Sequence, residues 1–104
     1  MAEAPTVKRP AECDTMAEAR AAIDVIDREL VAVLARRQRY IERVVTIKQR
    51  EGLPAAIPTR VEEVVANVVT QAREADLDPG VAEAVWRAMI AGFIAFEERG
   101  LGGS

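Results

Sequence analysis

Residues 15–50 contain neither proline nor glycine, and this run of 36 residues constrains the fold more than any other feature of the chain. Asp14 or Thr15 can cap a helix here, and Thr15 with Glu18 matches the capping-box pattern of a helix start. Large aliphatic residues follow at spacings of three and four, the period of one helix face. They are Ile23, Ile26, Leu30, Val33, Leu34, Ile41, Val44, Val45 and Ile47. The sequence therefore predicts one long helix, ended by the glycine and proline just beyond residue 51.

A helix of this length is too long for one small globule. At 1.5 Å per residue it extends over about 54 Å, whereas a compact chain of this size has a diameter of roughly 33 Å. Its apolar face continues to the far end, so another surface has to cover that end. A second copy of the chain is the simplest cover, and we expect an intertwined, helix-swapped homodimer.

The rest of the chain predicts two shorter helices. The second helix begins at Pro58 or Thr59, carries valines at helical spacing and ends near Asp76. An aspartate at residue 78, followed by a proline, gives the third helix an N-cap and a first-turn proline, and this helix runs to about residue 99. No segment has the alternating period of a strand, so the predicted fold class is all-α with three helices.

The two ends of the chain lack this periodicity. Residues 1–12 contain two prolines and mixed charges, and residues 100–104 are mostly glycine, so we expect both to be flexible tails. Residues 13–99 then form a single helical domain, as is usual for a chain of 104 residues.

Composition excludes several classes of function. The formal net charge of −3 argues against a nucleic-acid-binding protein. Since the chain has no histidine, histidine catalysis and nearly all zinc sites are excluded. Cys13 is the single cysteine, which suits a reducing compartment. No uninterrupted apolar run approaches the roughly 20 residues of a membrane span. We expect a cytoplasmic protein that binds neither nucleic acid nor membrane.

Cations beside apolar faces are the remaining candidates for chemistry. Arg37 and Lys48 are 11 residues apart, which is three helical turns plus about 20°, so they share one face of the first helix. The gap of about 16 Å along the axis would suit a small dianion held between their side chains. Arg20 is turned by about 100° from Arg37 and would instead reach the pocket of a partner chain.

Two residues in the shorter helices add to this set. Glu97 continues the apolar face of the third helix, where a carboxyl group can be retained as a neutral hydrogen-bond donor. Arg60 is a cation at the start of the second helix, a region that favours anions. The alternative is that all these residues are solvated or ion-paired at the surface. The chain would then be a non-catalytic helical dimerisation module.

The segment from Cys13 to Arg37 resembles the opening helix of the all-α chorismate mutases and of the related isochorismate-pyruvate lyases. It reads CDTMAEARAAIDVIDRELVAVLARR and contains the pattern R-x-x-I-D-x-[IL]-D-x-x-[LI]-[VL]-x-x-[LI]-x-x-R, with a lysine eleven residues later. The resemblance extends over about residues 12–99. It implies an intertwined three-helix homodimer with two identical sites for a small dicarboxylate, chorismate or isochorismate, and no cofactor or metal.

The resemblance also implies a role for each candidate residue. Arg37 and Lys48 stand where family members grip the substrate carboxylates, and the lysine also contacts the ether oxygen. Arg20 stands where an arginine closes the site of the partner chain, and Arg60 where a further arginine binds a carboxylate. Glu97 stands where many members have a glutamine that donates a hydrogen bond to the ether oxygen.

Two positions depart from the family pattern. Val61 replaces a glutamate that binds the substrate hydroxyl in typical mutases, and valine also occurs among the lyases. Glu97 replaces the glutamine that the lyases generally use, whereas some mutases have glutamate. The main interpretation is a chorismate mutase of aromatic amino acid biosynthesis in the shikimate pathway, which forms prephenate by a [3,3] pericyclic rearrangement. The alternative within the family is an isochorismate-pyruvate lyase that forms salicylate and pyruvate.

Overall fold

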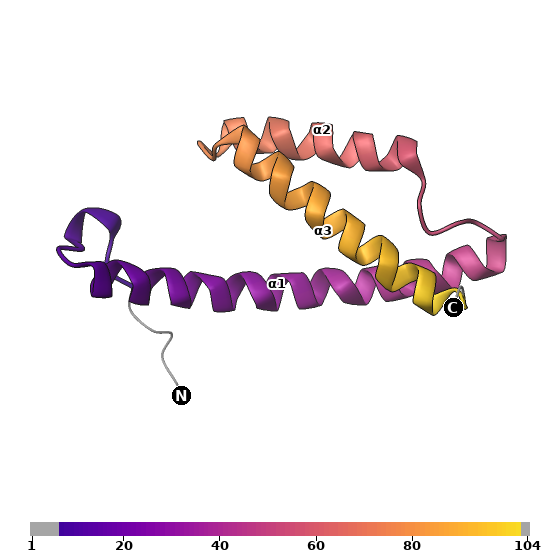
Figure 1. The fold of residues 1–104 in the computed structure, drawn as a ribbon, viewed down its shortest axis with the longest axis horizontal. Coiled ribbons are helices and arrows are strands. Elements are labelled where there is room, and N and C mark those ends of the chain that lie inside the picture. The colour runs from indigo at the N-terminus through magenta and orange to yellow at the C-terminus, as the bar shows by residue number, and fades with distance from the viewer. Residues whose placement is uncertain (1–6, 103–104) are drawn as a thin grey trace. The chain divides into compact units, whose positions relative to one another are not determined.

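The computed structural model describes residues 7–102, and in this range every element of secondary structure is a helix and there is no strand. A short 3-10 helix, η1, is followed by three α-helices (Figure 1). The elements are η1 at Pro10–Glu12, α1 at Met16–Glu51, α2 at Pro58–Glu74 and α3 at Pro79–Gly100. The prediction of an all-α fold with three helices, the first very long, is confirmed. The chain divides into two compact units between Gln38 and Arg39, within α1.

The start of α1 has the predicted cap in a slightly altered form. The Thr15 hydroxyl accepts a hydrogen bond from the Glu18 backbone N–H over 3.1 Å. The Glu18 carboxylate accepts from the backbone N–H of Asp14 over 3.2 Å, one residue earlier than in the usual capping box. Lys8 also pairs with this carboxylate. The flexible tails expected at residues 1–12 and 100–104 lie partly outside the described residues, and the described part of the first contains η1.

The apolar face in the N-terminal unit is exposed in the single chain. Five side chains of the predicted apolar face are between 37% and 55% exposed; they are Ile23, Ile26, Leu30, Val33 and Leu34. A continuous apolar face of this kind is unusual at the surface of a soluble monomer. The homodimer that would cover it stays a prediction.

In the C-terminal unit α2 and α3 pack together as a hairpin (Figure 1). The buried core residues are Val68, Ala72 and Ala82, with Val64 and Trp86 packed against them. Small alanines on both helices let the backbones approach closely, while the valines and the tryptophan fill the space beside them. The periodicity of the valines therefore identified the correct face of α2.

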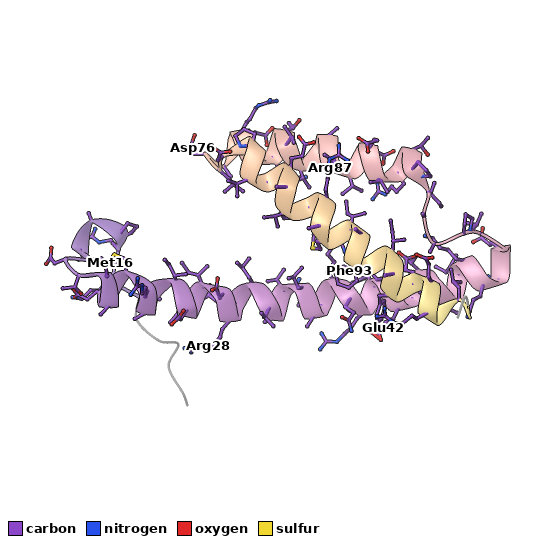
Figure 2. The ribbon with its side chains drawn as sticks, in the orientation of Figure 1. Met16, Arg28, Glu42, Asp76, Arg87 and Phe93 are labelled. Carbon is purple, nitrogen blue, oxygen red and sulfur yellow. The ribbon has the colours of Figure 1, made fainter. Side chains whose placement is uncertain are left out.

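A tight turn joins the two helices. Leu77 N–H bonds to the Ala72 carbonyl over 2.8 Å and Asp76 N–H to the Arg73 carbonyl over 3.3 Å, the two bonds of a Schellman motif. Asp76, which is labelled at this turn in Figure 2, adopts the left-handed conformation at φ 57°. This conformation costs an L-residue energy that glycine avoids. Asp78 then caps α3 by accepting from the Val81 N–H over 3.0 Å, as predicted.

Charged side chains reinforce the hairpin from outside. The Arg87 guanidinium donates from Nη1 and Nη2 to both oxygens of Glu62, each over 2.9 Å, and from Nε to Glu83. This two-point contact joins α3 to α2. Figure 2 labels Arg87. Its hydrogen bonds, and to a lesser degree the positive charge, hold the pKa of the Glu62 carboxyl below its ordinary value.

Among the described residues, α3 alone has the length and composition of a membrane-spanning helix, with a mean hydropathy of 1.3. A count of uninterrupted apolar residues did not find it, because Glu83 and Arg87 interrupt its apolar sequence. A single helix of this kind is weak evidence for a span. The buried Glu97 and the close packing of Ala82 in the core with α2 are features of a helix inside a folded helical unit.

Candidate active site

The end of α1 forms one side of the candidate site. Gly52 takes a left-handed conformation at φ 69°, which allows the chain to turn back sharply after the helix. Leu53 N–H then bonds to the carbonyl of Lys48 over 2.9 Å. The turn leads to Ala55, which is buried, and its carbonyl oxygen lies 2.7 Å from the Lys48 ammonium. The loop thus folds back onto the last turn of α1.

Glu97 of α3 meets the same ammonium. Lys48 Nζ donates to Glu97 Oε1 over 2.8 Å, and the two side chains are only 12% and 8% exposed. The two bonds account for two of the three N–H donors of the lysine. The contact joins two of the candidate residues across 49 positions of the chain. Their role in a site stays a prediction.

Burial strengthens the electrostatic interactions of the Lys48–Glu97 pair. Charges removed from water interact more strongly with each other and with any ligand than charges at the surface. The Ala55 carbonyl and the Glu97 carboxylate hold the ammonium from two sides. Its remaining N–H is therefore directed by the protein, as is needed to stabilise charge that develops on a nearby oxygen.

Two further positions of interest lie at the start of α2. Arg60 is 63% exposed at its side chain and pairs with Glu63, one turn along the helix. This exposed pair is the surface arrangement that the sequence analysis kept as an alternative for Arg60. Val61 is half-buried, so it contributes apolar surface at the position where the resemblance implies a glutamate in typical mutases.

Arg20 and Arg37 belong to the N-terminal unit. Within it Arg20 is exposed and Arg37 is half-buried. Their participation in a site with Lys48 stays a prediction.

Sequence reasoning missed the contacts made by the backbone. The Ala55 carbonyl bond to Lys48 and the bond from Gln49 to the Gly100 carbonyl depend on the path of a loop and the end of a helix. Any residue type supplies a carbonyl, so no side-chain pattern could reveal them. The positions of Gly52 and Pro54 were the available signal, because they forecast a sharp turn directly after Lys48.

Comparison with known proteins identifies the family of the chain. The sequence profile of the chorismate mutase type II family matches residues 19–98, which include Lys48 and Glu97. The chain is similar to the isochorismate pyruvate lyase of Pseudomonas aeruginosa, with 33% identity over 90 residues, covering 86% of this chain and 87% of that protein. No solved structure matches the chain. With most of its length matched by the profile, the chain belongs to the chorismate mutase type II family.

Proposed function

We propose that this protein is a chorismate mutase that converts chorismate into prephenate. The observation that carries the proposal is the buried Lys48–Glu97 pair, which joins the last turn of α1 to α3 in a family whose substrates are small dicarboxylates. The rearrangement breaks one C–O bond and forms one C–C bond within a single molecule. It needs no nucleophile and no external acid, so a site built from cations and one carboxyl group is sufficient.

In this proposal the pair acts on the ether oxygen of the breaking bond. Negative charge accumulates on this oxygen in the transition state, and the third N–H of Lys48 donates to it. Glu97 in its protonated form donates a second hydrogen bond. Preorganised donors of this kind contribute about 10²- to 10³-fold each to the rate. Arg37 and Arg60 bind the two carboxylates and hold the substrate in its compact reactive conformation.

The proposal includes a homodimer in which Arg20 reaches the site of the partner chain. Support comes from the exposed apolar face of α1, whose residues Ile23, Leu30 and Val33 are each more than half exposed in the single chain. Burying such a face against a second copy would remove a large apolar area from water. It would also bring a fourth cation to the site.

A second candidate activity is cleavage of isochorismate into salicylate and pyruvate. The similarity to the Pseudomonas lyase favours it, as does the half-buried Val61 in place of a hydroxyl-binding glutamate. Both activities would use the same cations, because both substrates are dicarboxylates with one enolpyruvyl ether bond.

Product analysis distinguishes the two activities. Purified protein is incubated separately with chorismate and isochorismate, and prephenate, pyruvate and salicylate are separated and quantified. Prephenate from chorismate is the expected result. Salicylate and pyruvate from isochorismate, without prephenate from chorismate, would replace the first proposal with the second. Consumption of neither substrate would contradict both as activities of the isolated protein, and would favour a dimerisation module or a mutase that needs an activating partner.

A further inference from the structure

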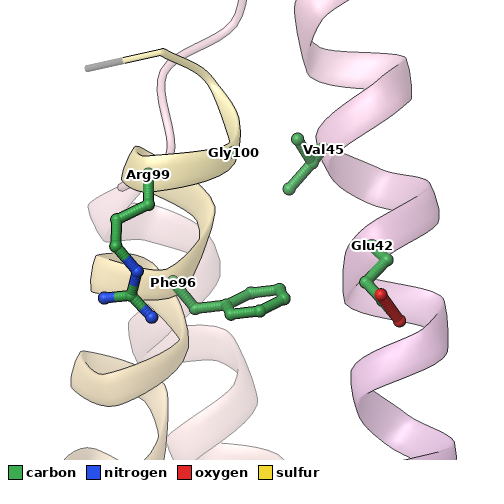
Figure 3. A pocket seen from close by; sticks show the side chains of 5 residues that line it. All are labelled: Glu42, Val45, Phe96, Arg99 and Gly100. Carbon is green, nitrogen blue, oxygen red and sulfur yellow. The ribbon is translucent and has the colours of Figure 1, made fainter. Parts of the chain in front are cut away.

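Gly100, the last residue of α3, lies against α1 with little room for a side chain on that side. A Cβ atom at this position would be 3.0 Å from Cγ1 of Val45 and 3.6 Å from its Cγ2. Figure 3 shows the Val45 side chain directed from α1 towards this end of α3. Val45 is buried, and a β-branched side chain in a helix has one strongly preferred rotamer. The absence of a side chain at Gly100 therefore sets how closely the two helices approach.

Gln49 holds the same residue from α1 by a hydrogen bond. Its side-chain Nε2 donates to the Gly100 carbonyl oxygen over 2.8 Å. This carbonyl lies in the last turn of α3, where no backbone N–H of the helix is available to donate to it, so it needs a donor from elsewhere. One close contact and one hydrogen bond thus fix the end of α3 against α1.

Both contacts lie next to the Lys48–Glu97 pair. Gln49 directly follows Lys48, and Gly100 is three residues after Glu97, which makes it a neighbour on the surface of the helix. A displacement of α3 at Gly100 therefore also displaces Glu97. At 2.8 Å the bond between the pair is near the middle of the usual range for hydrogen bonds, which weaken beyond about 3.2 Å.

We propose that Gly100 and Gln49 are positioning residues, which hold Glu97 at hydrogen-bonding distance from the Lys48 ammonium. This positioning role rests on the proposed function in one respect: it takes the Lys48–Glu97 pair as the place where the reaction occurs. A displacement of 1 Å in a catalytic group costs about 10²-fold in rate. The few tenths of an ångström that a methyl group at Gly100 would force are therefore measurable.

The test begins with Gly100→Ala and steady-state kinetics on chorismate and isochorismate. We expect kcat to fall about fivefold while KM changes little, because Arg37 and Arg60, which bind the two carboxylates in the proposed function, lie in α1 and α2 and not in α3. The matched control is Gly92→Ala in the same helix, where a Cβ would meet no atom within 4 Å. It should leave kcat unchanged. Equal kcat values for the two variants would overturn the role of Gly100.

Val45→Ala combined with Gly100→Ala separates positioning from general destabilisation. The smaller side chain removes both close methyl groups, so the helices return to their original distance and kcat recovers. The double variant also loses two buried methyl groups of Val45, beside an open pocket of about 380 Å³ that Val45, Gly100 and Phe96 help to line (Figure 3). It should therefore melt below Gly100→Ala. If kcat instead follows the melting temperature across the series, the positioning role is refuted.

Gln49→Met removes the hydrogen bond to the Gly100 carbonyl while keeping a side chain of similar length. Gln49 is exposed, so this variant is expected to fold. Loss of the donor should lower kcat by a similar factor, and Gln49→Lys, which keeps a donor for the carbonyl, should restore most of it. Identical kcat values for the methionine and lysine variants would remove Gln49 from the proposal.

A last measurement is independent of turnover. A double-mutant cycle of Lys48→Met and Glu97→Leu, followed by urea unfolding, measures the coupling between the two side chains, because each single variant removes their contact. We expect this coupling to fall by at least half in the Gly100→Ala background. Unchanged coupling would refute the positioning role whatever the activity of the protein. Reduced coupling in a protein that consumes neither substrate would support positioning and contradict only the proposed function.

Discussion

Replacing Glu97 by glutamine tests the Lys48–Glu97 pair from the carboxylate side. Glutamine has the same shape, and its side-chain oxygen still accepts from Lys48, so the variant loses the negative charge but keeps the contact. Because both side chains are about nine-tenths buried, removing the charge lowers the stability more than it would at the surface. A buried charge left without any partner costs about 3–5 kcal/mol, so with the hydrogen bond kept we expect about 1–2 kcal/mol. That corresponds to a decrease in Tm of roughly 5–10 °C for a domain of this size.

The same variant changes how the rate depends on pH. Glu97 has to carry a proton to donate to the ether oxygen, whereas an amide donates at any pH. The kcat for prephenate formation by the wild type should therefore rise as the assay pH falls from 8 to 5, and kcat of Glu97→Gln should stay constant. The matched control is Glu98→Gln, which removes the same charge from the neighbouring exposed residue and should change neither kcat nor Tm. A wild-type profile that is flat, or one that Glu97→Gln retains, would refute the donor role.

Three further predictions concern the dimer, the turn and the outer ion pair. Mixing Arg20→Ala with Lys48→Ala protomers should restore activity, because each heterodimer then contains one intact site; no recovery would contradict the swapped arrangement. Asp76→Gly should raise the free energy of unfolding by about 1 kcal/mol, since glycine adopts the left-handed conformation without cost, and a decrease in urea unfolding experiments would contradict this. Arg87→Met should lower Tm at neutral pH. The difference in Tm between the variant and the wild type should shrink below pH 4.5, the ordinary pKa of Glu62. The reason is that Arg87 lowers the pKa of the Glu62 carboxyl, and the stabilisation this gives is lost as the pH falls through the lowered pKa. A constant difference down to pH 2 would contradict that explanation.

The helices were predictable because their signals are local. The capping pattern at Thr15, the Asp-Pro pair at the start of α3 and the glycine after α1 each act within a few residues. The observed ends therefore differ by no more than two residues from those predicted. The largest difference is at the end of α2, where the chain leaves the helix at Glu74 and uses Ala75 and Asp76 in the turn.

The site was predictable only in its side chains. Lys48 and Glu97 could be selected because a charge on an apolar face is costly and needs a reason. Their contact depends on how α3 docks against the end of α1, which the spacing within each helix does not determine. The Gly100 contact with Val45 is of the same kind, since a glycine near a chain end gives no signal of close packing until the facing residue is known.

The central claim, that the Lys48 ammonium stabilises charge on the ether oxygen, is tested most directly by Lys48→Ala. The rate of prephenate formation at saturating chorismate is measured for the wild type and the variant, with circular dichroism and sedimentation to confirm equal helix content and oligomeric state. The account predicts a loss in kcat of about 10²- to 10³-fold. A variant that retains kcat within a factor of about three, while remaining folded, would contradict the account.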